Sequence, residues 1–372
     1  MDKINNLYLS RNLDLFIGNA LKKPMFSACS LGFYKSEQGK ISRKIFNYGR
    51  TGLGCEKNLV CEKTFFDLAS LTKPLVTSLV FLFLVDKGII KFEDNLAKFF
   101  SRVDSDKQLI KLHHLLTHTS GLPAHKPYFK ELVKLPVILR WNLVIEKILS
   151  EKLSYCPGKY CLYSDLGFIL LGCILERVTG EPLDIFWKKN ILQPMKIKNE
   201  LFFANKINTE KYSFVETGTC PWSKTILRGL VNDDNCRVLG GVAGHAGLFG
   251  TISGVLTFIE KLSSEIQGKT SILRFSTETI QTFLKKKKNT SWINGFDTPS
   301  AGCSSSGDYF SDMSFGHLGF TGTSFWMDIK KGCGVVMLTN RVLCGDDLNP
   351  IRKLRPLIHN LVMSYIKQKK SS

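Results

Sequence analysis

The sequence predicts an α+β fold in which helices flank an antiparallel sheet and a helical subdomain is inserted into it. Strand-like segments with alternating apolar residues lie near both ends of the chain, and helical patterns fill the middle. The strands of the two ends can therefore share one sheet, with the helical region between them. There is no internal repeat and no linker-like stretch, which favours one large domain or two intimate ones.

The 372 residues are expected to form a single domain with two subdomains. Segments 1–75 and 240–372 together would form an α/β sandwich, and segment 76–239 a mainly helical insert. The apolar content of 44% and the mean hydropathy of −0.01 are typical of a globular protein with a substantial core.

The elements at the two ends are predicted from short-range patterns. Apolar positions over 3–21 indicate an N-terminal helix, and segments 26–34 and 41–48 indicate two strands joined by a turn. Near the C-terminus, 316–322 indicates a turn-rich strand end. The remaining strand-like segments are 324–329 and 334–338. The remaining helical patterns cover 70–87, 112–118, 137–150, 165–179, 183–191, 252–262 and 351–367.

The segment Ser70-Leu71-Thr72-Lys73 combines a potential nucleophile with a potential base. A serine and a lysine three residues apart lie on one side of a helix, and the apolar run 75–85 predicts a buried helix that begins here. The N–H groups at a helix N-terminus favour developing negative charge. A serine hydroxyl needs a base, and a lysine can serve if burial and positive neighbours lower its pKa. This S-x-x-K pattern therefore predicts a serine nucleophile.

Two further segments carry candidate site residues. Tyr163 precedes the predicted helix 165–179, and a phenol beside an ammonium group can relay a proton, although simple packing is the alternative. Asp165 is expected to cap that helix. In the segment 315–324, Gly319 allows backbone N–H groups to approach a ligand closely, as in an oxyanion hole. His317 is expected to face the same site as a donor or a proton relay.

Charge and cysteine content limit the expected partners and compartment. The net charge of +19 is compatible with an anionic partner, but the lysines are mostly spread out and no nucleic-acid motif is present, so we expect no nucleic-acid partner. The apolar runs 75–85 and 166–175 are shorter than the ~20 residues of a membrane span. Eleven cysteines without a C-x-x-C pair, and an N-terminus without a signal-like segment, favour a cytoplasmic location. Export without a recognisable signal is the alternative, and the oligomeric state is not indicated.

The order of these motifs along the chain resembles that of the serine β-lactamase and penicillin-binding family. The closest likeness is its class C-type branch of esterases, peptidases and β-lactamase-related hydrolases. The S-x-x-K pattern is followed by Tyr163-Ser164-Asp165 and then by a late H-x-G element. The resemblance covers nearly the whole chain and implies a β-lactamase/transpeptidase-like fold. Other segments that resemble the family in the same order are Leu-Leu-Thr-His-Thr-Ser-Gly-Leu at 115–122, Gly-His-Ala-Gly-Leu-Phe at 244–249 and Leu-Thr-Asn-Arg at 338–341.

The resemblance also implies roles for individual residues. Ser70 would be the acylated nucleophile, Lys73 its partner base and Tyr163 the proton relay for acylation and deacylation. The backbone N–H groups of Ser70 and Phe320 would form the oxyanion hole. His317 would take the place of the lysine in the family's K-T-G motif.

Two departures from the family pattern affect these expectations. Asp165 stands where many members have asparagine, and its charge is expected to hold Lys73 protonated unless the carboxylate is neutralised or turned away. Leu318 replaces the threonine of K-T-G, whose hydroxyl helps to receive a substrate carboxylate together with the lysine. Because each lost hydrogen bond to a charged group is worth about 1.5–3 kcal/mol, ester or amide hydrolysis is favoured over efficient β-lactamase activity.

The expected function is therefore that of a metal-independent serine hydrolase without a cofactor. It would act on a small-molecule ester or amide through an acyl-enzyme at Ser70. An acyltransferase with the same acyl-enzyme, and a non-catalytic binding or regulatory protein with this fold, are the alternatives. His114 and His118 have metal-ligand spacing, but no third ligand suggests itself, so His118 is expected to be a packed, hydrogen-bonded residue. His245 is expected to have a structural role in a turn, and a position at the border of the active site is the alternative.

Overall fold

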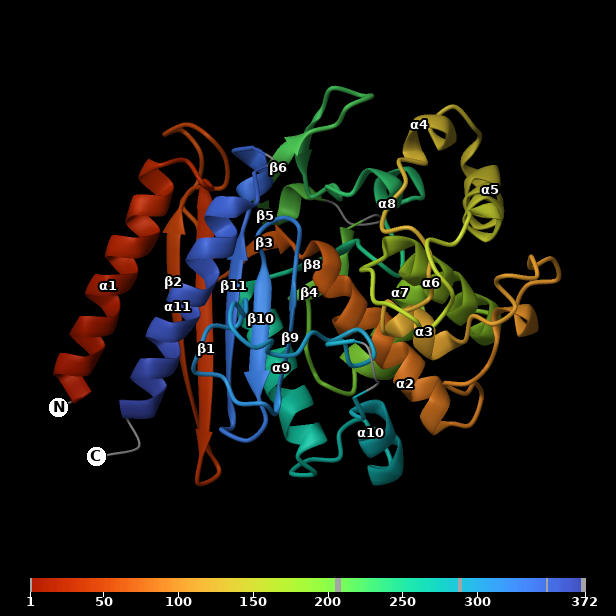
Figure 1. Cartoon of the computed structure of the whole chain (residues 1–372). Helices are drawn as coiled ribbons and strands as arrows, with labels where there is room; N and C mark the ends of the chain where they lie inside the picture. The colour runs from red at the N-terminus through yellow and green to blue at the C-terminus, as the bar shows by residue number, and fades with distance from the viewer. Residues whose placement is uncertain (1, 205–208, 287–289, 346, 369–372) are drawn as a thin grey trace.

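A five-stranded antiparallel sheet joins the two ends of the chain, as predicted (Figure 1). The computed structural model describes residues 2–204, 209–286, 290–345 and 347–368. The strand order is β2-β1-β11-β10-β9, so N-terminal β1 pairs with C-terminal β11. The strands are β1 (Ala28–Glu37), β2 (Lys40–Gly49), β9 (Ser314–Leu318), β10 (Ser324–Asp328) and β11 (Cys333–Thr339).

The strand pairing in this sheet places the end of β9 next to the helical region of the chain. Ser324 pairs with Leu318 on one side and with Met337 on the other, so β9, β10 and β11 form a continuous meander. Because β9 is the last strand of the sheet, its end and the turn that follows are available to contact the helical region.

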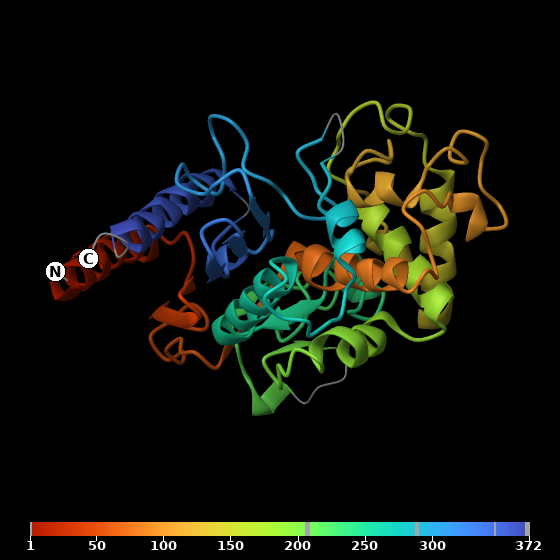
Figure 2. The same ribbon diagram turned by 90° about the horizontal axis from the view of Figure 1, so that it is seen from below.

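Helices cover both faces of the sheet. Helices α1 (Asp2–Lys22) and α11 (Asn349–Gln368) lie side by side on one face, as Figures 1 and 2 show. Their apolar side chains share a core with alternate residues of β1 and β11. Helix α9 (Ile252–Ile266) packs on the other face, where a Cβ at Gly32 would lie only 3.0 Å from Ile252. A larger residue at position 32 would therefore require the Ile252 side chain to shift.

The remaining helices form most of the middle of the chain. The predicted boundaries of α5 and α6 agree with the structure at both ends, because each has a clear apolar face and, in α6, a glycine stop. The predicted helix at 112–118 ends two residues early. These helices are α3 (Leu112–Leu116), α4 (Phe129–Leu132), α5 (Val137–Ser150), α6 (Asp165–Thr179), α7 (Leu183–Trp187), α8 (Asp234–Val238) and α10 (Thr277–Phe283).

The predicted helix at 70–87 begins irregularly. It consists of a 3₁₀ turn η1 (Ala69–Leu71), a π-helical turn η2 (Lys73–Thr77) and the α-helix α2 (Ser78–Asp86). Pro74 lies at the start of the π turn, and its missing N–H removes one regular helical hydrogen bond. By length and composition the stretch Ala69–Asp86 could cross a membrane, but 78% of it is buried inside the molecule, as in a core helix.

Short strands that the sequence patterns did not indicate form two smaller sheets. One has the order β4-β8-β3-β5 and the other pairs β6 with β7. Strands of two to four residues are too short to show an alternating pattern. The short strands are β3 (Thr64–Asp67), β4 (Leu201–Phe203), β5 (Ser213–Phe214), β6 (Glu216–Thr219), β7 (Ile226–Arg228) and β8 (Leu248–Gly250).

The division of the chain into two subdomains remains a prediction.

Candidate active site

Ser70 lies in a tight turn between β3 and α2. The residue before it, Ala69, has a positive φ of 48°, which is costly for a residue other than glycine. The buried carboxylate of Asp67 accepts hydrogen bonds from the N–H of Ala69 at 2.8 Å and of Asn232 at 2.7 Å. Burial raises the pKa of Asp67 to about 6, although these two hydrogen bonds oppose the shift. Asp67 therefore holds the strained turn that presents Ser70.

Lys73 is completely buried and points at Ser70. Its Nζ donates to Ser70 Oγ at 3.0 Å, to Asp165 Oδ1 at 2.7 Å and to the backbone oxygen of His245 at 3.2 Å. Burial by itself would lower the pKa of Lys73, but Asp165 and Tyr163 outweigh it and raise that pKa above its ordinary value. The structure thus joins the predicted nucleophile and the predicted base, with the lysine charged.

Tyr163 comes from the segment before α6 and completes this group. The Nζ of Lys73 lies 4.9 Å from the centre of the Tyr163 ring. Burial raises the pKa of the Tyr163 phenol, and its contacts with Lys73 and Ser70 act in the opposite direction. The phenol therefore shares the environment of Ser70 and Lys73, which a proton relay requires.

Asp165 does not cap α6, contrary to the sequence-based expectation. The cap is Ser164, whose Oγ accepts from the N–H of Gly167 at 3.3 Å. This frees the Asp165 carboxylate, with 18% of its side chain exposed, to form the ion pair with Lys73. Burial opposes ionisation of Asp165, but Lys73 and His125 outweigh it and hold its pKa well below the usual range. The carboxylate is therefore neither neutral nor turned away.

The turn between β9 and β10 packs against the Ser70 turn. Thr321 Oγ1 donates to the backbone oxygen of Asp67 at 2.7 Å, and Thr323 Oγ1 to that of Leu68 at 3.1 Å. A Cβ at Gly319 would lie 2.7 Å from the Leu68 oxygen, so only glycine fits. Among the residues that the structure describes, the N–H of the neighbouring Phe320 donates to no protein group, and neither does that of Ser70. Both N–H groups thus lack a partner in the described part of the chain, as the predicted oxyanion hole requires.

His317 lies beside Tyr163, with the two ring centres 6.0 Å apart. Its Nδ1 is 2.7 Å from the backbone oxygen of Leu318, so we assign the proton to Nδ1. Burial, assisted by the charge of Lys73, lowers the pKa of His317 to about 3. His317 is therefore neutral at physiological pH and its Nε2 is an acceptor, which does not fit the expected donor, whereas the expected proton relay stays a prediction.

A buried arginine on α11, which the sequence analysis missed, supports the β9–β10 turn. Arg355 is 3% exposed, and its Nη2 donates to the backbone oxygens of Gly319 and Thr323, each at 3.0 Å. Burial lowers the pKa of Arg355 to about 9. An isolated arginine in a helical pattern resembles any solvated residue, so no signal in the sequence indicates this contact.

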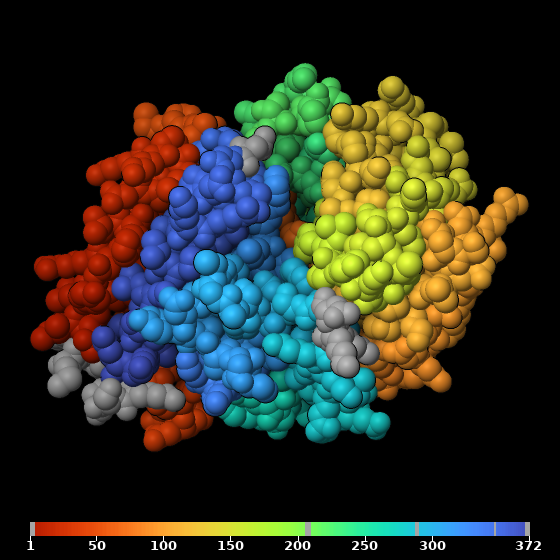
Figure 3. All heavy atoms as spheres, viewed as in Figure 1, coloured from red at the N-terminus to blue at the C-terminus, as the bar shows by residue number. Residues whose placement is uncertain are grey.

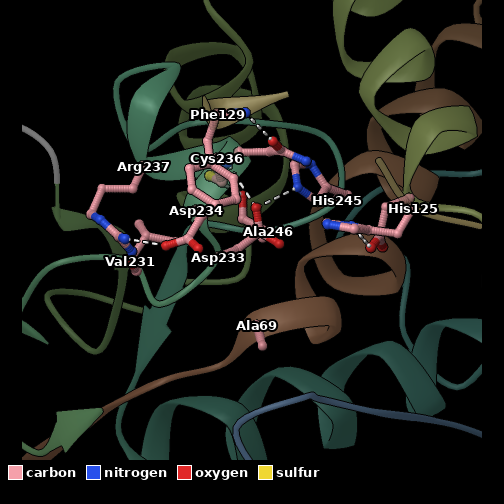
Figure 4. A network of polar contacts seen from close by, with 12 residues as sticks. Ala69, His125, Phe129, Val231, Asp233, Asp234, Cys236, Arg237, His245 and Ala246 are labelled. Atoms are coloured by element: carbon pink, nitrogen blue, oxygen red, sulfur yellow. Dashed lines mark hydrogen bonds and ion pairs between the residues drawn. The ribbon is translucent and has the colours of Figure 1, made fainter. Parts of the chain in front are cut away.

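A second group of polar residues lies beside Lys73, and of these the sequence analysis considered only His245. His245 Nε2 lies 2.9 Å from Asp233 Oδ1, while the His245 backbone oxygen accepts from Lys73. His125 Nδ1 lies 3.5 Å from Asp165 Oδ2. Figure 4 shows His245 and His125 pointing into the same region. His245 therefore contacts the site directly and is not only a turn residue.

The prediction for His118 is confirmed. The side chain is buried, its Nδ1 accepts from the N–H of Ser164 at 3.1 Å, and its ring packs 4.4 Å from that of Tyr163. In the described part of the chain, no group of three or more His, Cys, Asp or Glu side chains could hold a metal ion.

Figure 3 shows that the surface is hollowed between the blue C-terminal part and the yellow helical part of the molecule.

Comparisons with known proteins match most of the chain. The model of the Beta-lactamase family matches residues 47–354. The "Putative D-alanyl-D-alanine carboxypeptidase" of Escherichia coli K12 is 28% identical over 311 residues, covering 75% of this chain and 69% of that protein. The "N-acetylmuramyl-L-alanine amidase" of Bacillus subtilis is 28% identical over 323 residues, covering 75% of this chain and 68% of that protein.

A solved structure with the same fold is the octameric penicillin-binding protein homologue from Pyrococcus abyssi. Its TM-score is 0.67 at 20% sequence identity, and the superposition covers 94% of this chain and 77% of that one. At this identity the likeness concerns the fold, and it agrees with the predicted β-lactamase/transpeptidase-like architecture.

Proposed function

Because the chain belongs to the Beta-lactamase family, we propose that it is a serine hydrolase that cleaves an ester or an amide through an acyl-enzyme at Ser70. The observation that carries this proposal is the contact between Lys73 Nζ and Ser70 Oγ at 3.0 Å, with the Tyr163 ring 4.9 Å from the same Nζ. A nucleophile, an amine and a phenol in mutual contact are the groups that acyl transfer through serine requires.

In the first step, Ser70 Oγ attacks the substrate carbonyl carbon while its proton passes to the group formed by Lys73 and Tyr163. The carbonyl oxygen gains negative charge and binds to the backbone N–H groups of Ser70 and Phe320. The bond to the leaving group then breaks, and the leaving group receives the proton. In the second step a water molecule attacks the acyl-enzyme, which releases the acid and returns the proton to Ser70.

The substrate is an ester or an amide that does not depend on a carboxylate for binding. The K-T-G lysine and threonine are replaced by His317 and Leu318, and His317 is neutral because its pKa is lowered to about 3. A neutral acceptor cannot bind a carboxylate as a lysine does. The two relatives are named for amide hydrolysis, which supports hydrolysis of an acyl group at this site.

The test is capture of the acyl-enzyme by intact-protein mass spectrometry. A fluorophosphonate or a penicillin is expected to add one equivalent of mass, with the adduct located on the peptide that contains Ser70. A reactive ester should give a burst of product equal to one enzyme equivalent. A parallel screen of short-chain esters, D-amino-acid amides and a chromogenic cephalosporin identifies the preferred acyl group. Absence of any adduct, or an adduct on another residue, would contradict the proposal.

Arg355→Met is expected to lower kcat for ester hydrolysis about tenfold or more, with little change in KM. Without the guanidinium, the backbone oxygens of Gly319 and Thr323 lose their donor, and the turn that carries the Phe320 N–H is no longer held. Loss of a complete oxyanion-hole donor costs about 10²–10³ in kcat, so a displaced donor should cost less.

The control for this prediction is Arg352→Met, which removes an exposed arginine from the same helix. Steady-state kinetics and urea unfolding measure both variants. Equal loss of activity in the two variants, or a rise in KM without a change in kcat, would show that Arg355 does not act through the oxyanion hole.

A further inference from the structure

The position of Asp165 raises a problem of charge for the proposed function. A lysine accepts a proton from serine only in its neutral form, yet Asp165 Oδ1 lies 2.7 Å from Nζ of a completely buried Lys73. A carboxylate at this distance favours the charged amine. Each unit by which the pKa of Lys73 rises lowers its neutral fraction tenfold at a given pH below that pKa.

His125 lies on the opposite side of the same carboxylate. Lys73 contacts Oδ1 of Asp165, whereas Nδ1 of His125 lies 3.5 Å from Oδ2. The His125 side chain is 47% exposed, so it can exchange protons with solvent. Asp165 thus lies between the buried cation of the site and a second, solvent-accessible group that can carry a positive charge.

The loop that carries His125 is attached to the start of α6. The N–H of Asp165 donates to the backbone oxygen of Ala124 at 2.9 Å, and Ser164 Oγ donates to that of Pro123 at 2.7 Å. Both bonds involve residues directly before His125. The proximity of His125 and Asp165 is therefore built into the backbone of two segments.

The other charged groups that face His125 also favour its charged form. Asp233 and Asp234, at the start of α8, act on it in addition to Asp165, and Asp233 is in turn bonded to His245. The contact with Asp165 is the main reason that the pKa of His125 is raised above its ordinary value, against the effect of partial burial. Lys73 lies on the other side of Asp165, and its positive charge repels that of a charged His125.

We propose that charged His125 offsets the negative charge of Asp165 and thereby allows Lys73 to act as a base toward Ser70. The pair of Asp165 and His125 is then neutral overall. It acts electrostatically like the asparagine that the family pattern has in place of Asp165. His125 is in this sense a positioning residue that acts through Asp165 and does not touch the substrate. The inference depends on the proposed function, because it concerns the base of that reaction.

The experiment is a double-mutant cycle with His125→Gln, Asp165→Asn and the combined variant. The rate of Ser70 acylation by a reactive ester is measured from pH 5.5 to 9.5. At pH 6, His125→Gln is expected to be slower than the wild type by about tenfold, which corresponds to one pKa unit on Lys73. The combined variant should be at least several times faster than His125→Gln, because no carboxylate then remains to be offset.

The pH profile distinguishes this role from a structural one. Above its own pKa, His125 in the wild type is neutral too, so the deficit of His125→Gln should become smaller as the pH rises. His125→Lys, which keeps a cation, should retain activity at pH 6. The matched control is His113→Gln, which removes another histidine 3.5 Å from a carboxylate, that of Glu93, outside the site. We expect wild-type rates for this control.

The outcomes separate the two proposals. If the wild type forms no adduct at Ser70, the proposed function is wrong. If the wild type is acylated at Ser70 but His125→Gln has a pH-independent deficit, or the combined variant is no faster than His125→Gln, only the role of His125 is wrong. Thermal unfolding of each variant shows whether a lost rate reflects a lost fold.

Discussion

Ser70→Ala lowers kcat for a reactive ester by a factor on the order of 10⁴ or more, while the protein remains folded. Removal of the serine nucleophile in a hydrolase costs up to about 10⁶ in kcat. The fold should persist because Lys73 keeps its hydrogen bonds to Asp165 and to the backbone oxygen of His245. Initial rates and mass labelling by a fluorophosphonate measure the loss, and circular dichroism measures the fold.

The matched control for this variant is Ser78→Ala. Ser78 is a buried serine on α2, and in the described part of the chain its Oγ has no hydrogen-bond partner. We expect this control to keep its activity and its labelling. Turnover by Ser70→Ala at the wild-type rate would mean that no acyl-enzyme forms at Ser70, and the non-catalytic alternative would then become the better explanation of the fold.

Lys73→Met is expected to reduce both activity and stability. Loss of the amine removes the proton acceptor of Ser70, and we expect kcat to fall on the order of 10³-fold. The free energy of unfolding at pH 7 should decrease by about 3 kcal/mol, because removal of one partner leaves the other charge of a buried pair uncompensated. This value is at the lower end of the range because Asp165 is 18% exposed and keeps His125.

The combined variant Lys73→Met/Asp165→Asn separates these two effects. It removes the uncompensated carboxylate, so urea unfolding should show that most of the lost stability returns. Activity should not return, because no amine is restored. Recovery of activity in this variant would exclude Lys73 as the base, and an unchanged free energy of unfolding in Lys73→Met would exclude a stabilising ion pair.

The fold was predictable where local patterns are strong. Helices α5 and α6 have apolar faces and clear boundaries, and the strands at both chain ends alternate clearly enough to be assigned to one sheet. The irregular start of the Ser70 helix was not predicted. Its π turn depends on how Pro74 and the preceding strained turn are accommodated in the core, and a residue pattern does not contain that information.

The residue pattern alone was sufficient to predict the groups that act within one turn or one motif. Ser70 and Lys73 are three residues apart and meet because the helical repeat brings them to one side, and Tyr163 was recognisable from its motif. The charge that each of these groups carries depends instead on the folded arrangement of the chain. The partners of Lys73 and of the β9–β10 turn come from distant segments, and the charge that a buried group carries depends on which atoms lie within a few ångströms of it, wherever they fall in the chain.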